Sequence, residues 1–236
     1  MSRKGFSLIE SLLGLCFLFF IVISSLEIFG IARHLFFKIK GAEEESQAAF
    51  AALDKMRIDI LHAGMGLLRP MRLGVLDGLT LDGGILSTVS LDKIFILAED
   101  IIPGQTQVQL ENTDGLSPGR ELCLCDDDKG EAISIAQVHD RAIIFSSPFA
   151  FAYSREQASL LLLERISFYY DENNKTIRRK VNLSPPQPLA EEIDRLDFQF
   201  EKATNLATLS FSFQAHKEKK YEISVFAKNT GLALPH

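Results

Sequence analysis

The chain has 236 residues, 47% of them hydrophobic, and a formal net charge of −6 at pH 7. This length allows one large or two small domains, and the apolar fraction is compatible with a hydrophobic core plus a membrane helix. The negative charge and the absence of a basic patch in the sequence argue against a nucleic-acid-binding protein, so we expect no direct contact with nucleic acid.

The first thirty residues contain an apolar segment that is long enough to cross a membrane. Residues 11–26 carry no charge, and together with residues 6–9 they approach the roughly 20 residues that a bilayer core requires. Arg3 and Lys4 are the only charges before Glu10, so the positive-inside rule predicts a cytoplasmic N-terminus. No A-x-A-type cleavage site follows the segment, so we expect this helix to stay in the mature protein.

Residues 3–10 read RKGFSLIE and resemble the processing motif of type IV pilins and type II secretion pseudopilins. In that family a short basic leader ends in Gly, a membrane peptidase cuts after it on the cytoplasmic side, and the new N-terminal residue is N-methylated. The resemblance implies a leader peptide over residues 1–5, cleavage by prepilin peptidase between Gly5 and Phe6, and N-methylation of Phe6. Glu10 then becomes the fifth residue of the mature chain.

Glu10 is an ionisable residue in an apolar helix, a placement that costs about 2.5–3.5 kcal/mol by insertion scales. After cleavage, the amine of Phe6 lies one helical turn away. The Glu10 carboxylate can neutralise this amine or that of a neighbouring helix, because a paired buried ion costs far less than a lone one. We therefore expect Glu10 to be an assembly residue. The alternative is an ordinary signal anchor with Glu10 at the cytoplasmic interface.

A helical pattern continues over residues 30–66. Apolar residues recur at three- and four-residue steps with charged residues mostly opposite, which indicates an amphipathic helix. The apolar positions are Ala49, Phe50, Leu53, Met56, Ile60 and Ala63, and the charged ones are Glu43, Glu44, Glu45, Asp54, Lys55 and Asp59. Gly64, Gly66 and Pro70 predict the end of the helix. We therefore expect a transmembrane helix over residues 6–29 that continues as an amphipathic helix over 30–66.

Beyond residue 70 the pattern changes to short alternating runs separated by turn dipeptides, which is typical of antiparallel sheet. Strands are expected over residues 93–98, 106–111, 120–125, 132–138, 142–146, 160–170 and 176–181, and around residues 198–200, 209–213 and 221–225. Residues 119–149 indicate a meander. We expect loops and short strands over 71–91, a stiff connector over 184–188 and a short helix over 189–196. The predicted class is α+β, with a long N-terminal helix packed on a mainly antiparallel β-sheet head, residues 67–236.

Cys123 and Cys125 flank one residue of a predicted strand, so their side chains share a face. Positions i and i+2 of a strand lie near the outer limit of the Cα spacing of a disulfide. A buried pair of free thiols is therefore favoured over a disulfide.

Asp126, Asp127, Asp128 and Glu131 form an acidic turn. Clustered carboxylates suit calcium, but this spacing matches no calcium loop, so an exposed hairpin turn is favoured. The histidines are scattered, and neither a P-loop nor a G-x-S-x-G motif occurs. We therefore expect no enzyme activity, metal, cofactor or small-molecule substrate.

The size of the chain and its intact Glu10 resemble minor subunits of the family, namely PilW-type minor pilins and J-type pseudopilins. Residues 59–64 also resemble the end of the long helix in these proteins. The resemblance implies a single-pass inner-membrane protein with a periplasmic head, which partners other pilins or pseudopilins in a pilus, a pseudopilus or its initiating complex. The sequence does not distinguish pilus, secretion and DNA-uptake systems. The alternative is an uncleaved, membrane-anchored periplasmic binding or sensory domain.

Overall fold

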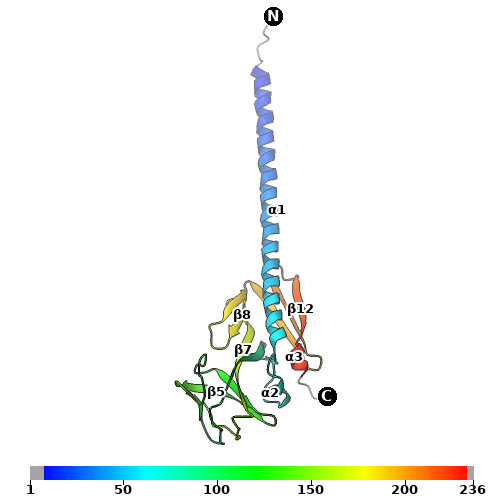
Figure 1. Ribbon diagram of the computed structural model, residues 1–236. Helices are drawn as coiled ribbons and strands as arrows, with labels where there is room; N and C mark the ends of the chain where they lie inside the picture. The colour runs from blue at the N-terminus through cyan, green and yellow to red at the C-terminus, as the bar shows by residue number, and fades with distance from the viewer. Residues whose placement is uncertain (1–7, 233–236) are drawn as a thin grey trace. The chain divides into compact units, whose positions relative to one another are not determined.

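A computed structural model describes residues 8–232 of the chain (Figure 1). The chain divides into two compact units, Met1–Gln47 and Ala48–His236. Helix α1 (Leu8–His62) contributes residues to both units. The class is α+β, as predicted, with one long N-terminal helix followed by a mainly antiparallel β-sheet region.

The first unit, over its described part, is the α1 segment of residues 8–47. Its side chains are exposed or half-buried throughout. Ser25 Oγ donates a hydrogen bond of 2.7 Å to the carbonyl oxygen of Ile21, so this hydroxyl is satisfied within the helix. Lys40 and Glu44 form an exposed i, i+4 ion pair of 3.6 Å. Such pairs stabilise a helix only weakly.

In the second unit, α1 buries one stripe of side chains. The buried residues are Ala49, Ala52, Leu53, Met56, Asp59 and Ile60, at the three- and four-residue steps of a helix face. Phe50 was predicted to belong to this stripe, but its side chain is 65% exposed and contacts the ring of Tyr221 edge-on. The helix ends at His62, and Gly64 adopts a φ of +74°, a conformation that glycine tolerates without steric cost.

The strands pair antiparallel in two sheets. Their bounds are β1 (Leu79–Asp82), β2 (Ile85–Phe95), β3 (Gln107–Gln109), β4 (Glu121–Cys125), β5 (Gly130–Val138), β6 (Ala142–Phe145), β7 (Ser159–Asp171), β8 (Thr176–Val181), β9 (Gln187–Ala190), β10 (Ile193–Glu201), β11 (Leu206–Phe213) and β12 (Lys220–Phe226). The larger sheet has the order β1-β2-β7-β4-β5-β6-β3, and β8 pairs with both β7 and β9. The smaller sheet has the order β10-β11-β12. The meander predicted over residues 119–149 is confirmed, because β5 pairs with both β4 and β6.

Two segments differ from the predictions. The short helix expected over residues 189–196 is wrong, because these residues form the end of β9, a turn at Glu192 with a φ of +58°, and the start of β10. Ala190 pairs with Ile177 of β8, and pairing within a sheet outweighs a weak helical propensity. The expected connector over residues 184–188 is also partly wrong, since Gln187 begins β9. Strand β9 lies at the edge of the sheet, where a proline is tolerated.

A third difference concerns residues 71–95. A short helix, α2 (Leu68–Arg72), precedes the strands, and β2 begins eight residues before the strand that was expected at residue 93. The alternating pattern of β2 is hard to see in the sequence because its central residues are buried on both faces.

The largest core joins both sheets to α1. Figure 1 shows β8 and β12 on opposite sides of the C-terminal part of α1. Phe168 and Ile177 from the larger sheet and Leu209 and Phe211 from the smaller sheet belong to one buried cluster with the α1 stripe. Two smaller clusters line the opposite faces of β4 and β7.

Asp59 of α1 is buried within the second unit, although the sequence pattern placed it among the charged residues opposite the stripe. Arg179 of β8 approaches it with both Nε and Nη2, at 2.6 and 3.2 Å. Lys55 adds an ion pair of 3.3 Å. Two N–H groups on one carboxylate are the strong form of a charge-assisted hydrogen bond. This pair therefore fixes the helix against one strand at a single register.

We predict that Arg179→Met destabilises the protein by about 3 kcal/mol, because it leaves the Asp59 carboxylate buried without its main partner. The double variant Asp59→Leu/Arg179→Met is expected to recover most of this loss, since an apolar pair can replace a buried ion pair at little cost. Denaturant unfolding of the full chain in detergent, followed by near-ultraviolet circular dichroism, gives the measurement.

The matched control is Lys217→Met, which removes one partner of the exposed Lys217–Asp194 pair. It is expected to change the free energy of unfolding by less than about 1 kcal/mol. Equal effects of Lys217→Met and Arg179→Met would contradict the proposed importance of the buried pair.

Candidate functional site

The residues of the predicted processing motif lie at the start of the chain. Gly5 and Phe6 lie outside the described residues, so the cleavage and methylation sites remain predictions. Glu10 is described: it occupies the first turn of α1 and is exposed. An acidic side chain is favourable there because the N-terminal end of a helix carries partial positive charge.

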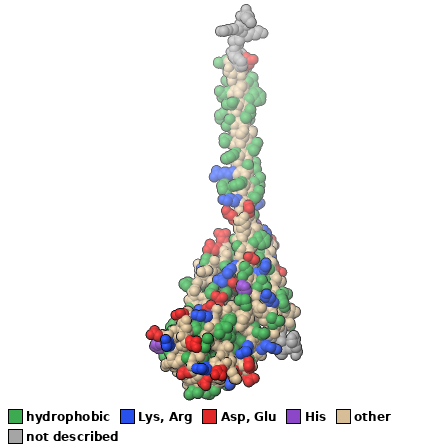
Figure 2. Space-filling view, viewed as in Figure 1, with side chains coloured by type: hydrophobic (Ala, Val, Ile, Leu, Met, Phe, Trp, Pro, Cys, Tyr) green, Lys and Arg blue, Asp and Glu red, His purple; other side chains and the backbone are tan. Residues whose placement is uncertain are grey.

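The segment that follows Glu10 is apolar on every side of the helix. Among residues 8–232, α1 is the one helix that is long and apolar enough to cross a membrane, and Figure 2 shows hydrophobic side chains along it. Phe17, Phe19 and Phe20 are between 64% and 70% exposed, and Cys16 is an exposed free thiol. A continuous apolar surface of this kind is unfavourable in water and marks a membrane or protein contact.

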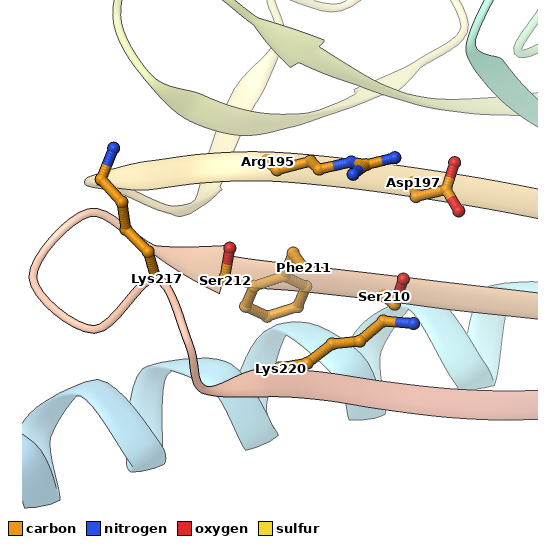
Figure 3. Close-up of a pocket in the computed structure, with 7 residues that line it drawn as sticks. All are labelled: Arg195, Asp197, Ser210, Phe211, Ser212, Lys217 and Lys220. Atoms are coloured by element: carbon orange, nitrogen blue, oxygen red, sulfur yellow. The ribbon is translucent and has the colours of Figure 1, made fainter.

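A polar groove of about 280 Å³ lies on the smaller sheet (Figure 3). Two rows of side chains cross the three strands in register, one of Arg195, Ser212 and Lys220 and the next of Asp197, Ser210 and Glu222. Figure 3 shows the two serines on one side of β11 and the ring of Phe211 on the other. The sheet therefore has one polar face and one apolar face, and the apolar face joins the core with α1.

The charges around this groove are mostly neutralised locally. Lys217 Nζ lies 2.6 Å from Asp194, and Lys220 Nζ lies 2.5 Å from Glu222. Asp194 raises the pKa of Lys217, so this lysine stays charged. The lining residues include no histidine or cysteine that could activate a serine hydroxyl. The groove therefore has the properties of a solvated sheet face. The sequence did not predict it, because its residues come from three strands and are brought together only by the way these strands pair.

Cys123 and Cys125 lie on one face of β4, as predicted, and both are buried free thiols. The hydrogen bond between the two thiols raises the pKa of Cys123 and lowers the pKa of Cys125. They belong to an apolar cluster with Leu161 and Leu163 of β7. Thiols without solvent access act as small apolar side chains, so this pair has a packing role.

The acidic turn connects β4 to β5, which makes it the predicted hairpin turn. Asp126 accepts backbone hydrogen bonds of 2.9 Å from Asp128 and Lys129. Asp127 pairs with Arg69 at 3.1 Å, and the Glu131 carboxylate accepts hydrogen bonds from the backbone N–H groups of Ala150 and Phe151. The carboxylates are thus directed to different partners. Within residues 8–232, no three His, Cys, Asp or Glu side chains are grouped so that they could hold a metal ion.

Comparisons with known proteins place the chain in no family. No family model and no curated protein matches it. The Gp54 tailspike of Acinetobacter baumannii bacteriophage AP22, solved with A. baumannii capsular saccharide, aligns at 18% identity and a TM-score of 0.29 over 33% of this chain and 15% of the tailspike. The Pseudomonas phage phi297 tailspike gp61 aligns at 14% identity and a TM-score of 0.28 over 31% and 14%. Matches this weak carry no argument about fold or function.

The hydrogen bonds of Asp126 in the hairpin turn predict how the stability of the fold depends on pH. Burial alone would raise the pKa of Asp126, but the N–H groups of Asp128 and Lys129 and the Lys129 ammonium outweigh it, so the pKa lies below its usual value. A depressed pKa stabilises the fold above the unfolded-state pKa of about 3.9, and this contribution is lost as pH falls through the folded-state value.

We therefore expect Asp126→Asn to lower the unfolding midpoint at pH 7, and the difference from wild type to shrink below about pH 4. Asp128→Asn is the matched control, because the neighbouring Asp128 contributes its backbone N–H rather than its carboxylate to the turn. Thermal unfolding between pH 3 and pH 7 measures both. A difference that stays constant across this range would contradict the assignment.

Proposed function

We propose that this chain is a minor pilin or minor pseudopilin, a structural assembly subunit that is processed by prepilin peptidase. The proposal rests on one observation. Gly5, Phe6 and Glu10 have the spacing of the processing motif, and Glu10 lies in the first turn of a long helix whose next residues are apolar. Cleavage after Gly5 would leave a free amine on Phe6 one turn from the Glu10 carboxylate. That geometry supports charge neutralisation within a bundle of such helices.

The long helix supports the same proposal. Its first part is exposed and apolar, which suits residues 6–29 as a membrane span. Its last part joins the core of the β-rich unit, which suits a head that the helix anchors to the membrane. In this proposal the N-terminus lies in the cytoplasm and the head, residues 67–236, lies in the periplasm. Incorporation into a type IV pilus, a type II secretion pseudopilus or the complex that initiates it would proceed through the helix.

The first test is the intact mass of the protein purified from its native membrane. We expect a chain that begins at N-methylated Phe6. We further expect Gly5→Leu to block processing, because the motif resembles a peptidase site that requires a small residue at this position. A chain that retains residues 1–5 in wild type would favour the alternative, an uncleaved membrane-anchored binding or sensory domain.

Gly14→Leu is the matched control for Gly5→Leu. A Cβ atom added at Gly14 meets no other atom within 4 Å, so the larger side chain is accommodated on the helix surface. It introduces the same side chain nine residues further along the chain, outside the proposed motif. We expect the Gly14→Leu chain to be processed and the Gly5→Leu chain to accumulate at full length. This result would show that processing requires a small residue at position 5 specifically.

We also expect Glu10→Val to leave membrane insertion intact but to impair incorporation into filaments, because only the pairing between carboxylate and amine is lost. Alkaline carbonate extraction measures insertion, and the amount of the subunit in sheared filaments or cross-linked assemblies measures incorporation. Glu43→Val changes an exposed acidic residue of the same helix and serves as the control. Normal incorporation of Glu10→Val would exclude the assembly role of Glu10.

A further inference from the structure

A cluster of cations follows the proposed membrane span on α1. Arg33, Lys38 and Lys40 lie within eight residues of one another, and all three are exposed. No acidic residue occurs between Glu27 and Glu43. We call residues 31–40 the cationic belt. The proposed function does not account for this cluster, because the resemblance to the processing motif ends at Glu10.

Cations and large apolar side chains are mixed around the helix in the cationic belt. Ile31, Leu35 and Ile39 recur every four residues and lie close together on the helix surface, with Lys38 beside them. Arg33 and Lys40 are seven residues apart and lie on another side, together with Phe37. Long basic side chains can extend along neighbouring apolar side chains and keep their charged ends in water or among lipid headgroups, which suits the end of a membrane span.

Aromatic rings strengthen this placement. Phe36 and Phe37 are 63% and 56% exposed, and their rings meet edge-on at 5.9 Å. The guanidinium of Arg33 lies 5.6 Å from the centre of the Phe37 ring. The arginine therefore lies over an apolar ring while its remaining N–H groups stay available. Arginine N–H groups match the geometry of phosphate oxygens, so they suit a phospholipid headgroup.

The position of the belt along the helix sets its depth. A span over residues 6–29 is about 36 Å long, which exceeds the roughly 30 Å of hydrocarbon but not the roughly 40–45 Å that include the headgroups. Residue 31 therefore lies at headgroup level, and residue 40 lies about 14 Å further along the helix. The cations of the belt thus lie at the membrane surface or just outside it, where an anionic surface still attracts them over about a Debye length. Glu43, Glu44 and Glu45 follow immediately and are repelled by an anionic surface, so the attractive segment ends before them.

The belt places three Lys or Arg residues directly after the proposed span, whereas two precede it. The positive-inside rule disfavours cations on the translocated side, so this count opposes the orientation that was inferred from Arg3 and Lys4 alone. A contact with anionic headgroups would stabilise them in that position. Lys40 is held by an exposed pair with Glu44 at 3.6 Å, which is weak enough to be exchanged for a phosphate.

We propose that residues 31–40 bind anionic phospholipid headgroups and so set how deeply α1 sits in the membrane. This inference rests on the membrane span proposed above. The occupant is a lipid phosphate and not an acidic side chain of a second copy, because the belt continues directly from the apolar segment and alternates its cations with exposed apolar side chains.

The chain contains no tryptophan, so a single introduced tryptophan reports on one position without background. The full chain with Phe36→Trp is reconstituted into vesicles of phosphatidylcholine and phosphatidylglycerol, in which either one lipid or the other is brominated. Quenching of the fluorescence gives the enrichment of each lipid around position 36. Because one Lys or Arg near an anionic surface changes binding about fivefold, we expect at least about threefold enrichment of phosphatidylglycerol.

The triple variant Arg33→Gln/Lys38→Gln/Lys40→Gln is expected to abolish this enrichment, as is high salt, which screens exposed charges. Arg141→Gln/Lys180→Gln/Lys228→Gln is the matched control, since it removes three exposed cations of the other unit and should preserve the enrichment. Equal quenching by both lipids in the otherwise wild-type chain would overturn the proposal, and it is the result expected if a second copy supplied the acidic partner.

A second reporter, Phe19→Trp, lies within the proposed span and separates this inference from the proposed function. Quenching at position 19 by both lipids, with none at position 36, would retain the span and overturn the belt. Absence of quenching at position 19 would overturn the span itself, and the belt with it. Quenching at both positions, with a preference for phosphatidylglycerol only at position 36, is the expected result.

Discussion

The burial of one face of α1 is the constraint on which the β-rich unit depends. Ala49, Ala52, Met56 and Ile60 are at most 1% exposed, and they share a cluster with residues from both sheets. Small side chains on the helix let the strands approach closely, while Met56 fills the irregular space between larger residues. The smaller sheet has a polar outer face, so its apolar residues need this core.

The Asp59–Arg179 pair adds specificity to that burial. Apolar side chains alone tolerate a small shift of a helix along a sheet, since their contacts are non-directional. A buried carboxylate with two N–H partners does not, because a shifted helix would leave a charge unpaired in the core. The cost of a wrong register therefore exceeds the stability that the pair contributes in the right one.

The features that were predicted from the sequence are those encoded locally. The helix follows from a long run of helical spacing, and β4, β5, β6 and β8 were found within about two residues because turn dipeptides separate alternating runs. The burial of Asp59 could not be predicted, since its partner lies 120 residues away in the sequence. The helix predicted around Ala190 was wrong for the same reason. The composition of this segment suits a helix, but Ala190 pairs with Ile177, which is distant in the sequence, and so forms a strand.

The candidate sites likewise differ in how far the sequence alone predicts them. The residues of the proposed processing motif are contiguous in the sequence, so the sequence alone was enough to suggest it. The cationic belt depends on the helix, because the helix exposes the cations and apolar side chains of residues 31–40 around one axis. The proposed function also explains the order of charges along α1. Glu10 would be compensated by an amine, residues 11–26 would need no compensation, and the cations of the belt would be compensated by lipid phosphate. Under the proposed function each part of the helix would then be matched to one environment, and charge, not a break in the helix, would set the boundary between them.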